Sequence, residues 1–195
     1  MLSVGYTVDV VSPGKPFPGT VKTAVHDFEA GDATYCEKAG HAFALTRAWG
    51  GGRDLSPDHY DALFLPGGRA PEYLRLDAEV MAVVSTFFGA ALSAAPKRGR
   101  PVVIVAVCHG VQFLAALDRG MRPTDTTRLT GYPACGPDMR AAGCGAWTDC
   151  PPDGAVSGRL GPHGVLITSP AWPGHPAVLR ELYAAVGTTI EHAEA

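Results

Sequence analysis

The feature that most constrains the fold is a run of apolar residues, Val102–Val107, that follows Pro101 and leads directly into Cys108-His109-Gly110. A run this short and unbroken is typical of a strand buried on both faces of a parallel sheet. Asp61–Leu65 has the same character and ends at Pro66-Gly67-Gly68. Parallel strands need crossover helices, so we expect an α/β fold with a doubly wound parallel sheet in a three-layer sandwich.

Hydrophobic periodicity and turn residues predict the other elements. Strands are expected over residues 6–11, 21–28, 41–46, 129–132 and 165–169, with turns at Gly31-Asp32 and Ala39-Gly40. Helices are expected over residues 71–75, 111–117, 138–142 and 176–186, and from an N-cap at Asp77 to about Ala94. The longest helix has apolar residues at helical spacing, namely Val80, Val83, Val84, Phe87, Phe88 and Ala91. The length of 195 residues suits a single domain over 1–195.

Charge and hydropathy exclude several classes of function. The net charge is −3 and no basic run occurs, so we expect neither nucleic acid nor an anionic membrane as a partner. The longest apolar run has the length of a strand, and the first residues lack the features of a signal peptide. These observations predict a cytoplasmic protein.

The five cysteines are irregularly spaced, which favours reduced thiols: Cys36, Cys108, Cys135, Cys144 and Cys150. The last three, together with His163, could in principle bind zinc, but they lack the close paired spacing of structural zinc sites. We therefore expect no metal and no cofactor.

Cys108 lies where the predicted central strand meets a helix, which is the position of a nucleophile on a tight turn. The helix N-terminus should favour the thiolate, and sites in open α/β sheets lie at the carboxyl ends of strands. The alternative is a buried cysteine that acts as a small apolar residue, which does not account for the following His109-Gly110. The Gly67-Gly68 pair lets the backbone approach a ligand and direct an N–H towards it, although glycine pairs are also frequent in ordinary turns.

Residues Tyr60–Arg75, together with Ala106–Gly110, resemble the ThiJ/PfpI superfamily, which has a flavodoxin-like (class I glutamine amidotransferase-like) fold. That group includes intracellular cysteine peptidases, glutathione-independent glyoxalases (glyoxalase III) and deglycase and chaperone relatives. The segments Val8–Lys15, Ala24–Phe28 and Ala171–Pro176 are similar to its PfpI-like branch.

The resemblance implies roles for five residues. Cys108 would be the nucleophile, His109 its partner, and Glu72 the carboxylate that orients the histidine across a subunit interface of a homo-oligomer, whether dimer, trimer or hexamer. The backbone N–H groups of Gly68 and His109 would form the oxyanion hole, and His175 would contact substrate. Glu72 could instead be a solvated carboxylate in the first turn of a helix, and His175 a structural histidine.

The sequence departs from this family pattern at its start. Relatives begin with an apolar strand and a helix ahead of the segment that matches Gly5–Val10, and that strand carries a glutamate that contacts the nucleophilic sulfur. No residue here can be assigned that role, and strand edges would be left unpaired. The explanations are a misassigned start codon, which we favour, a shortened isoform, or an inactive relative. If Met1 is the true start, we expect low stability and weak or absent catalysis. A smaller departure is Val111, where relatives often have proline.

The leading functional hypothesis is a glyoxalase or deglycase acting on methylglyoxal-like carbonyls without glutathione, metal or nucleotide. The enzymatic alternative is a cysteine peptidase or amidase that acts on peptides. Amidotransferase activity is disfavoured, because His175-Pro176-Ala177 stands where glutaminases of this fold have His-Pro-Glu. The non-enzymatic alternatives are a redox sensor or chaperone, in which Cys108 is oxidised to the sulfinate, and a pseudoenzyme.

Overall fold

The computed structural model describes residues 1, 4–27, 36–50, 54–93 and 99–189. The chain falls into two compact units, residues 1–50 and 51–195, which are considered separately. Among the described residues, no helix has both the length and the apolar character needed to cross a bilayer.

The first unit is built around an antiparallel hairpin of β1 (Thr20–Asp27) and β2 (Cys36–Ala44). The strands expected over 21–28 and 41–46 are thus present, but β2 begins five residues earlier than expected, whereas Phe28 and the turn at Gly31-Asp32 lie outside the described residues. The turn expected at Ala39-Gly40 is wrong, because both residues lie within β2. The pairing is irregular between Lys22 and Ala24, and a side chain at Gly40 would meet the backbone of Thr23, so this glycine accommodates a bulge.

The strand expected over residues 6–11 is also wrong, since this segment joins no sheet in the described chain. Its backbone is held at Val10, which donates its N–H to Thr46 Oγ1 and accepts a hydrogen bond from the N–H of Thr46, and at Tyr6, whose N–H donates to the carbonyl oxygen of Met1. A β-branched sequence favours extended backbone, but a ladder also needs a neighbouring strand.

The second unit confirms the predicted α/β class, with a parallel sheet flanked by helices. The strand order is β3-β4-β8-β7, formed by β3 (Ala62–Leu65), β4 (Val102–Val107), β8 (Gly164–Ser169) and β7 (Val156–Leu160). β3, β4 and β8 are parallel, and every residue of β4 is buried. β7 was not predicted and runs antiparallel to β8, so the sheet is not wholly parallel.

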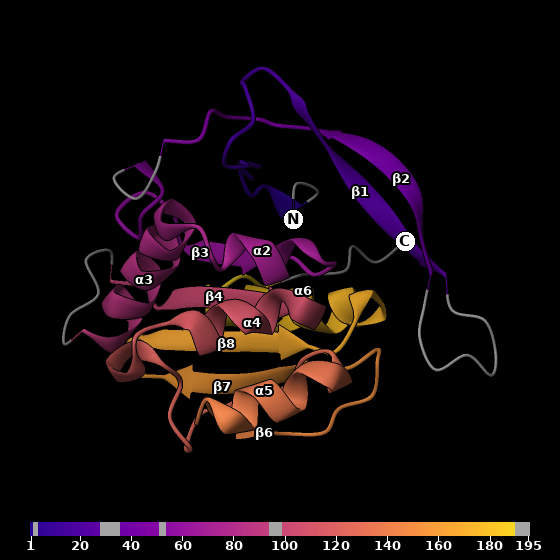
Figure 1. Ribbon diagram of the computed structural model, residues 1–195. Coiled ribbons are helices and arrows are strands. Elements are labelled where there is room, and N and C mark those ends of the chain that lie inside the picture. The colour runs from indigo at the N-terminus through magenta and orange to yellow at the C-terminus, as the bar shows by residue number, and fades with distance from the viewer. Residues whose placement is uncertain (2–3, 28–35, 51–53, 94–98, 190–195) are drawn as a thin grey trace, which may run out of the picture. The chain divides into compact units, whose positions relative to one another are not determined.

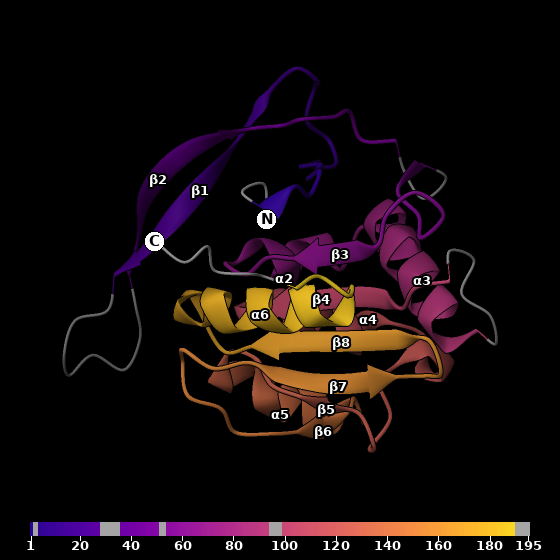
Figure 2. The same cartoon turned by 180° about the vertical axis from the view of Figure 1, so that it is seen from behind.

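The helices lie on both faces of this sheet. α4 (Gln112–Ala116) and α5 (Gly136–Ala141) lie in front of it in Figure 1, and α6 (His175–Ala185) covers the opposite face, as Figure 2 shows. The remaining helices are α2 (Ala70–Leu74), α3 (Ala78–Leu92) and the short 3₁₀ turns η2 (Cys108–Val111), η3 (Arg119–Met121), η4 (Pro133–Cys135) and η5 (Trp172–Gly174). A small parallel pair, β5 (Arg128–Leu129) and β6 (Ala146–Trp147), completes the unit.

Local signals placed α3 accurately. The side chain of Asp77 accepts hydrogen bonds from the N–H groups of Glu79 and Val80, as expected of an N-cap. All six apolar residues singled out by their helical spacing are buried. The helix packs against β4 and β8 and helps to fix the strand that carries the site.

Candidate active site at the end of β4

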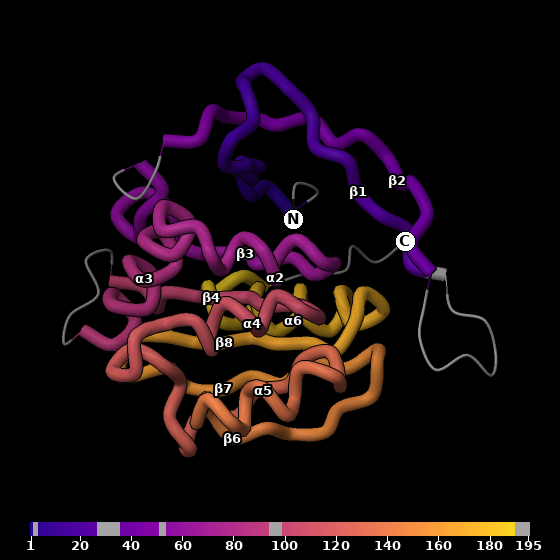
Figure 3. Tube along the Cα trace, viewed as in Figure 1, coloured from indigo at the N-terminus to yellow at the C-terminus, as the bar shows by residue number. Residues whose placement is uncertain are grey.

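β4 ends at a strained turn that begins with Cys108. This residue has a φ of 58°, and it is the only non-glycine residue with positive φ in the part of the chain described. Residues other than glycine rarely adopt this left-handed backbone conformation, and such strain is concentrated at functional sites. The turn continues as η2 and then α4, a path that is visible in the tube of Figure 3. The predicted elbow is therefore present in its geometry.

The two glycines that follow the neighbouring strand, β3, lie close to this turn. A Cβ atom added at Gly67 would lie 2.6 Å from Cys108 Cβ and 3.0 Å from the carbonyl oxygen of Val107, so no larger residue fits there without displacement. Gly68 has a φ of +80°, which turns its N–H towards the sulfur. β3 and β4 are parallel, so their carboxyl ends bring these glycines and Cys108 together.

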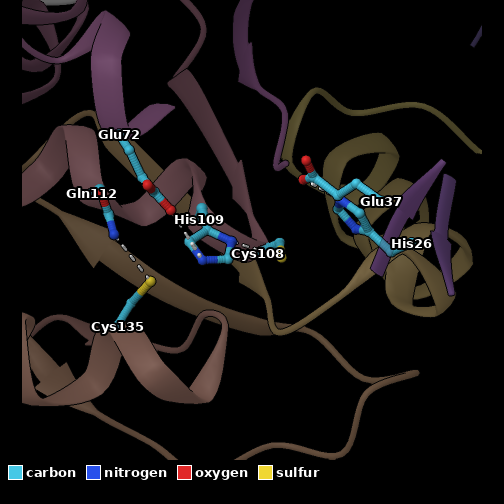
Figure 4. A network of polar contacts seen from close by, with 7 residues as sticks. All are labelled: His26, Glu37, Glu72, Cys108, His109, Gln112 and Cys135. Carbon is cyan, nitrogen blue, oxygen red and sulfur yellow. Dashed lines mark hydrogen bonds and ion pairs between the residues drawn. The ribbon is translucent and has the colours of Figure 1, made fainter. Parts of the chain in front are cut away.

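Three of the predicted side chains meet at this point, all within one chain. Cys108 Sγ lies 3.4 Å from His109 Nδ1, and His109 Nε2 lies 3.6 Å from Glu72 Oε1 (Figure 4). The imidazole is 9% exposed and the glutamate side chain 32%. The two ring nitrogens thus face a thiol on one side and a carboxylate on the other, the arrangement in which a carboxylate stabilises an imidazolium. The contact that the family resemblance placed across an interface is made here within a single chain.

The electrostatic environment of the thiol differs from the expectation. Burial raises the pKa of Cys108, and hydrogen bonds from the backbone N–H groups of His109 and Gly68 offset part of this increase. The expected lowering of the pKa by N–H groups at this turn is present, but desolvation outweighs it and the net shift is upward. The thiol needs a base to ionise at neutral pH, and His109 Nδ1 is in contact with it.

His175 occupies a separate position. It is the first residue of α6, and its ring packs edge to face against Phe64 of β3, with ring centroids 6.2 Å apart. Desolvation by the surrounding protein lowers the pKa of His175. This contact places it beside the strand that leads to Gly67, and a role in binding substrate stays a prediction.

Three neighbours of the site were not identified from the sequence. Tyr132 stacks on the His109 ring at 4.6 Å, with an angle of 23° between the planes, and its N–H donates to the carbonyl oxygen of Cys108. Gln112 and Cys135 are in contact beside them. Gln112 lies four residues after Cys108, a spacing that could have revealed it. Tyr132 is the last residue of the strand expected over 129–132, but the observed strand β5 ends at Leu129. No local motif marks Cys135.

The described residues contain no group of three or more His, Cys, Asp or Glu side chains that could hold a metal ion. Cys135 and Cys144 are buried, and burial raises the pKa of each to about 11.

The sequence is similar to those of known proteins. Residues 2–185 match the DJ-1/PfpI family. The chain is 39% identical over 188 residues to protein DJ-1 homolog D of Arabidopsis thaliana, which covers 96% of this chain and 42% of that protein. It is 38% identical over 98 residues to a deglycase of Pyrococcus abyssi, 49% of each chain, and 37% identical over 73 residues to protein/nucleic acid deglycase 2 of Escherichia coli. The chain thus spans less than half the length of each of these relatives. With the family match extending over nearly all of its residues, the chain belongs to the DJ-1/PfpI family.

Proposed function

We propose that this chain is a cysteine-dependent enzyme that converts methylglyoxal-like carbonyls to hydroxy acids. The observation that carries the proposal is the contact of His109 with both Cys108 and Glu72. The thiol sulfur lies 3.4 Å from Nδ1 of the imidazole, and the carboxylate oxygen lies 3.6 Å from Nε2. Relatives that are named deglycases support it, because an early glycation adduct forms by addition to the aldehyde carbon of a dicarbonyl and can revert to it.

The first step forms a carbon–sulfur bond. His109 Nδ1 takes the proton of Cys108, and the thiolate adds to the aldehyde carbon of methylglyoxal. The imidazolium returns the proton to the aldehyde oxygen, which gives a hemithioacetal. Glu72 stabilises the imidazolium through Nε2, while the N–H groups of Gly68 and His109, which face the sulfur, are placed to stabilise the developing oxyanion.

The second step moves a proton between neighbouring carbons. Neutral His109 removes the hydrogen on the carbon bonded to sulfur and delivers it to the adjacent carbon, while the hydroxyl proton passes from the first oxygen to the second. These two transfers convert the hemithioacetal to a thioester of lactate. Water then cleaves the thioester, so that one methylglyoxal and one water give one lactate and the free thiol. No redox partner is needed, because the aldehyde carbon is oxidised as the ketone carbon is reduced.

The test is lactate formation from methylglyoxal, followed by proton NMR. The wild-type protein should produce lactate, and Cys108→Ala should abolish it. Cys36→Ala is the matched control, since Cys36 is an exposed thiol of β2, and should retain wild-type activity. If the wild type forms no lactate, or if Cys108→Ala forms it at the wild-type rate, the proposal is wrong.

A cysteine amidase or peptidase is the second candidate. Acyl transfer by a thiol also uses backbone N–H groups to stabilise an oxyanion, and those of Gly68 and His109 lie beside the sulfur where that oxyanion would form. Chromogenic amides and short peptides, assayed in parallel with methylglyoxal on the same variants, separate the two. Amide cleavage that depends on Cys108, without lactate formation, would favour the hydrolase.

A further inference from the structure

Gln112 is a buried polar residue whose side-chain amide has a hydrogen-bond partner at its nitrogen but none at its oxygen. It begins α4, and 7% of its surface is exposed. Its Nε2 donates to Cys135 Sγ at 3.5 Å (Figure 4). Its Oε1 is the one buried side-chain nitrogen or oxygen without a hydrogen-bond partner in the part of the chain described. Folded proteins rarely leave such an oxygen unpaired, so this one requires an explanation.

The chemistry of Cys135 favours the opposite orientation of the amide. Cys135 is 1% exposed, and burial raises the pKa of its thiol to about 11, so it is protonated at neutral pH. A protonated thiol donates through its S–H and accepts only weakly, whereas an amide oxygen is a good acceptor. The oxygen and nitrogen of a glutamine amide have nearly the same shape, and their assignment follows from the hydrogen-bond network. If the amide is turned over, Oε1 accepts the S–H of Cys135.

The Glu72 carboxylate is a nearby candidate acceptor for the amide nitrogen that is then released. α2, which carries Glu72, packs against both α4 and η2. The charge of Glu72 is among those that raise the pKa of Cys135, so the carboxylate lies near the thiol that Gln112 contacts. Figure 4 shows Glu72 reaching His109 from the side on which Gln112 lies. An N–H donor to a carboxylate forms one of the stronger hydrogen bonds in proteins.

We propose that Gln112 is a positioning residue for Glu72, with Oε1 accepting a hydrogen bond from the Cys135 thiol and Nε2 donating one to the Glu72 carboxylate. The order of contacts is then Cys135, Gln112, Glu72, His109 and Cys108. This inference rests on the proposed function for its catalytic meaning. Gln112 touches no reacting atom; it holds the carboxylate directed at His109 Nε2, which stabilises the imidazolium formed when His109 takes the thiol proton.

The proposal has a defined consequence for pH dependence. Removing the Nε2 donor leaves the Glu72 carboxylate free to turn away from His109, so the imidazolium is stabilised less and Cys108 ionises at higher pH. The titratable groups around this cluster come from each element packed on it: Glu72 from α2, Cys108 and His109 from η2, Tyr132 from the turn before η4, Cys135 from η4 and Asp138 from α5.

The orientation of the amide can be tested by infrared spectroscopy of the S–H stretch. The Cys135 band is isolated by subtracting the spectrum of Cys135→Ala from that of the wild type, with Cys135→Val as a second reference. A band at lower frequency than that of a free thiol, which returns towards the free position in Gln112→Met, is the expected result. A free-thiol band in the wild type would overturn the assignment.

The positioning role can be tested by a double-mutant cycle on the alkylation of Cys108 by iodoacetamide. The rate is measured from about pH 6 to about pH 10 for wild type, Gln112→Met, Glu72→Gln and the double variant, with thermal unfolding as a check on folding. We expect Gln112→Met to lower the rate at neutral pH by roughly threefold to tenfold, and to have no effect in the Glu72→Gln background.

The same loss in both backgrounds would mean that Gln112 acts only through packing, which overturns the proposal. Alkylation requires no carbonyl substrate. A protein that follows the expected cycle but forms no lactate would therefore reject the proposed function and leave the role of Gln112 standing.

Discussion

Replacement of Gly67 by alanine should displace the nucleophile. The added Cβ would lie 2.6 Å from Cys108 Cβ, about 0.8 Å short of the 3.4 Å at which ordinary contact begins. The carbonyl oxygen of Val107, at 3.0 Å, prevents escape in that direction. β4 is buried along its whole length, so the strained turn at Cys108 and the end of β3 must absorb the shift.

The magnitude follows from this displacement. A misplacement of about 1 Å costs roughly 10²-fold in rate, and overpacking a well-packed region costs roughly 1–3 kcal/mol of stability. We therefore expect Gly67→Ala to lower kcat/KM for methylglyoxal by about 100-fold and to lower the free energy of unfolding by about 2 kcal/mol. Lactate formation and urea unfolding measure the two effects.

Gly89→Ala provides the matched control. Gly89 lies in the exposed part of α3, its φ is not positive, and an added Cβ meets nothing within 4 Å. This substitution should leave activity unchanged and stabilise the protein by about 0.5–1 kcal/mol. If Gly67→Ala folds and retains activity within about twofold of the wild type, the close approach of β3 to Cys108 does not position the nucleophile, and the reasoning is wrong.

Three further predictions concern the same unit. Glu72→Gln should lower kcat/KM by up to about tenfold, because the lost partner of His109 is charged but partly exposed; an unchanged rate would exclude a role for the carboxylate. Because burial raises the pKa of Cys108, its alkylation by iodoacetamide should be slow at neutral pH and accelerate as the pH rises, and a plateau reached below neutrality would contradict that direction. Asp77→Ala should cost about 1 kcal/mol in urea unfolding without a change in kcat/KM, since it removes only the N-cap of α3.

Local sequence information was sufficient for several elements. The unbroken apolar run predicted β4, and the spacing of buried residues and the Asp77 cap predicted α3. β7 escaped prediction because a short segment with a central Gly158 has little strand propensity of its own, and pairing with β8 decides its state. The opposite error occurred at residues 6–11, which have strand propensity but no paired neighbour in the described chain.

The candidate site divides in the same way. The sequence by itself determined the elbow, since a buried strand followed by Cys108-His109-Gly110 leaves little choice of backbone, and the family resemblance named Glu72 and Gly68. Only the tertiary structure decided that Glu72 reaches His109 within one chain and that Tyr132 stacks on the imidazole. It also decided that the net shift in the pKa of the Cys108 thiol is upward, because burial outweighs the backbone N–H groups. The physical reason is that backbone propensities act over a few neighbouring residues, whereas desolvation and contacts between side chains depend on segments that only folding brings together.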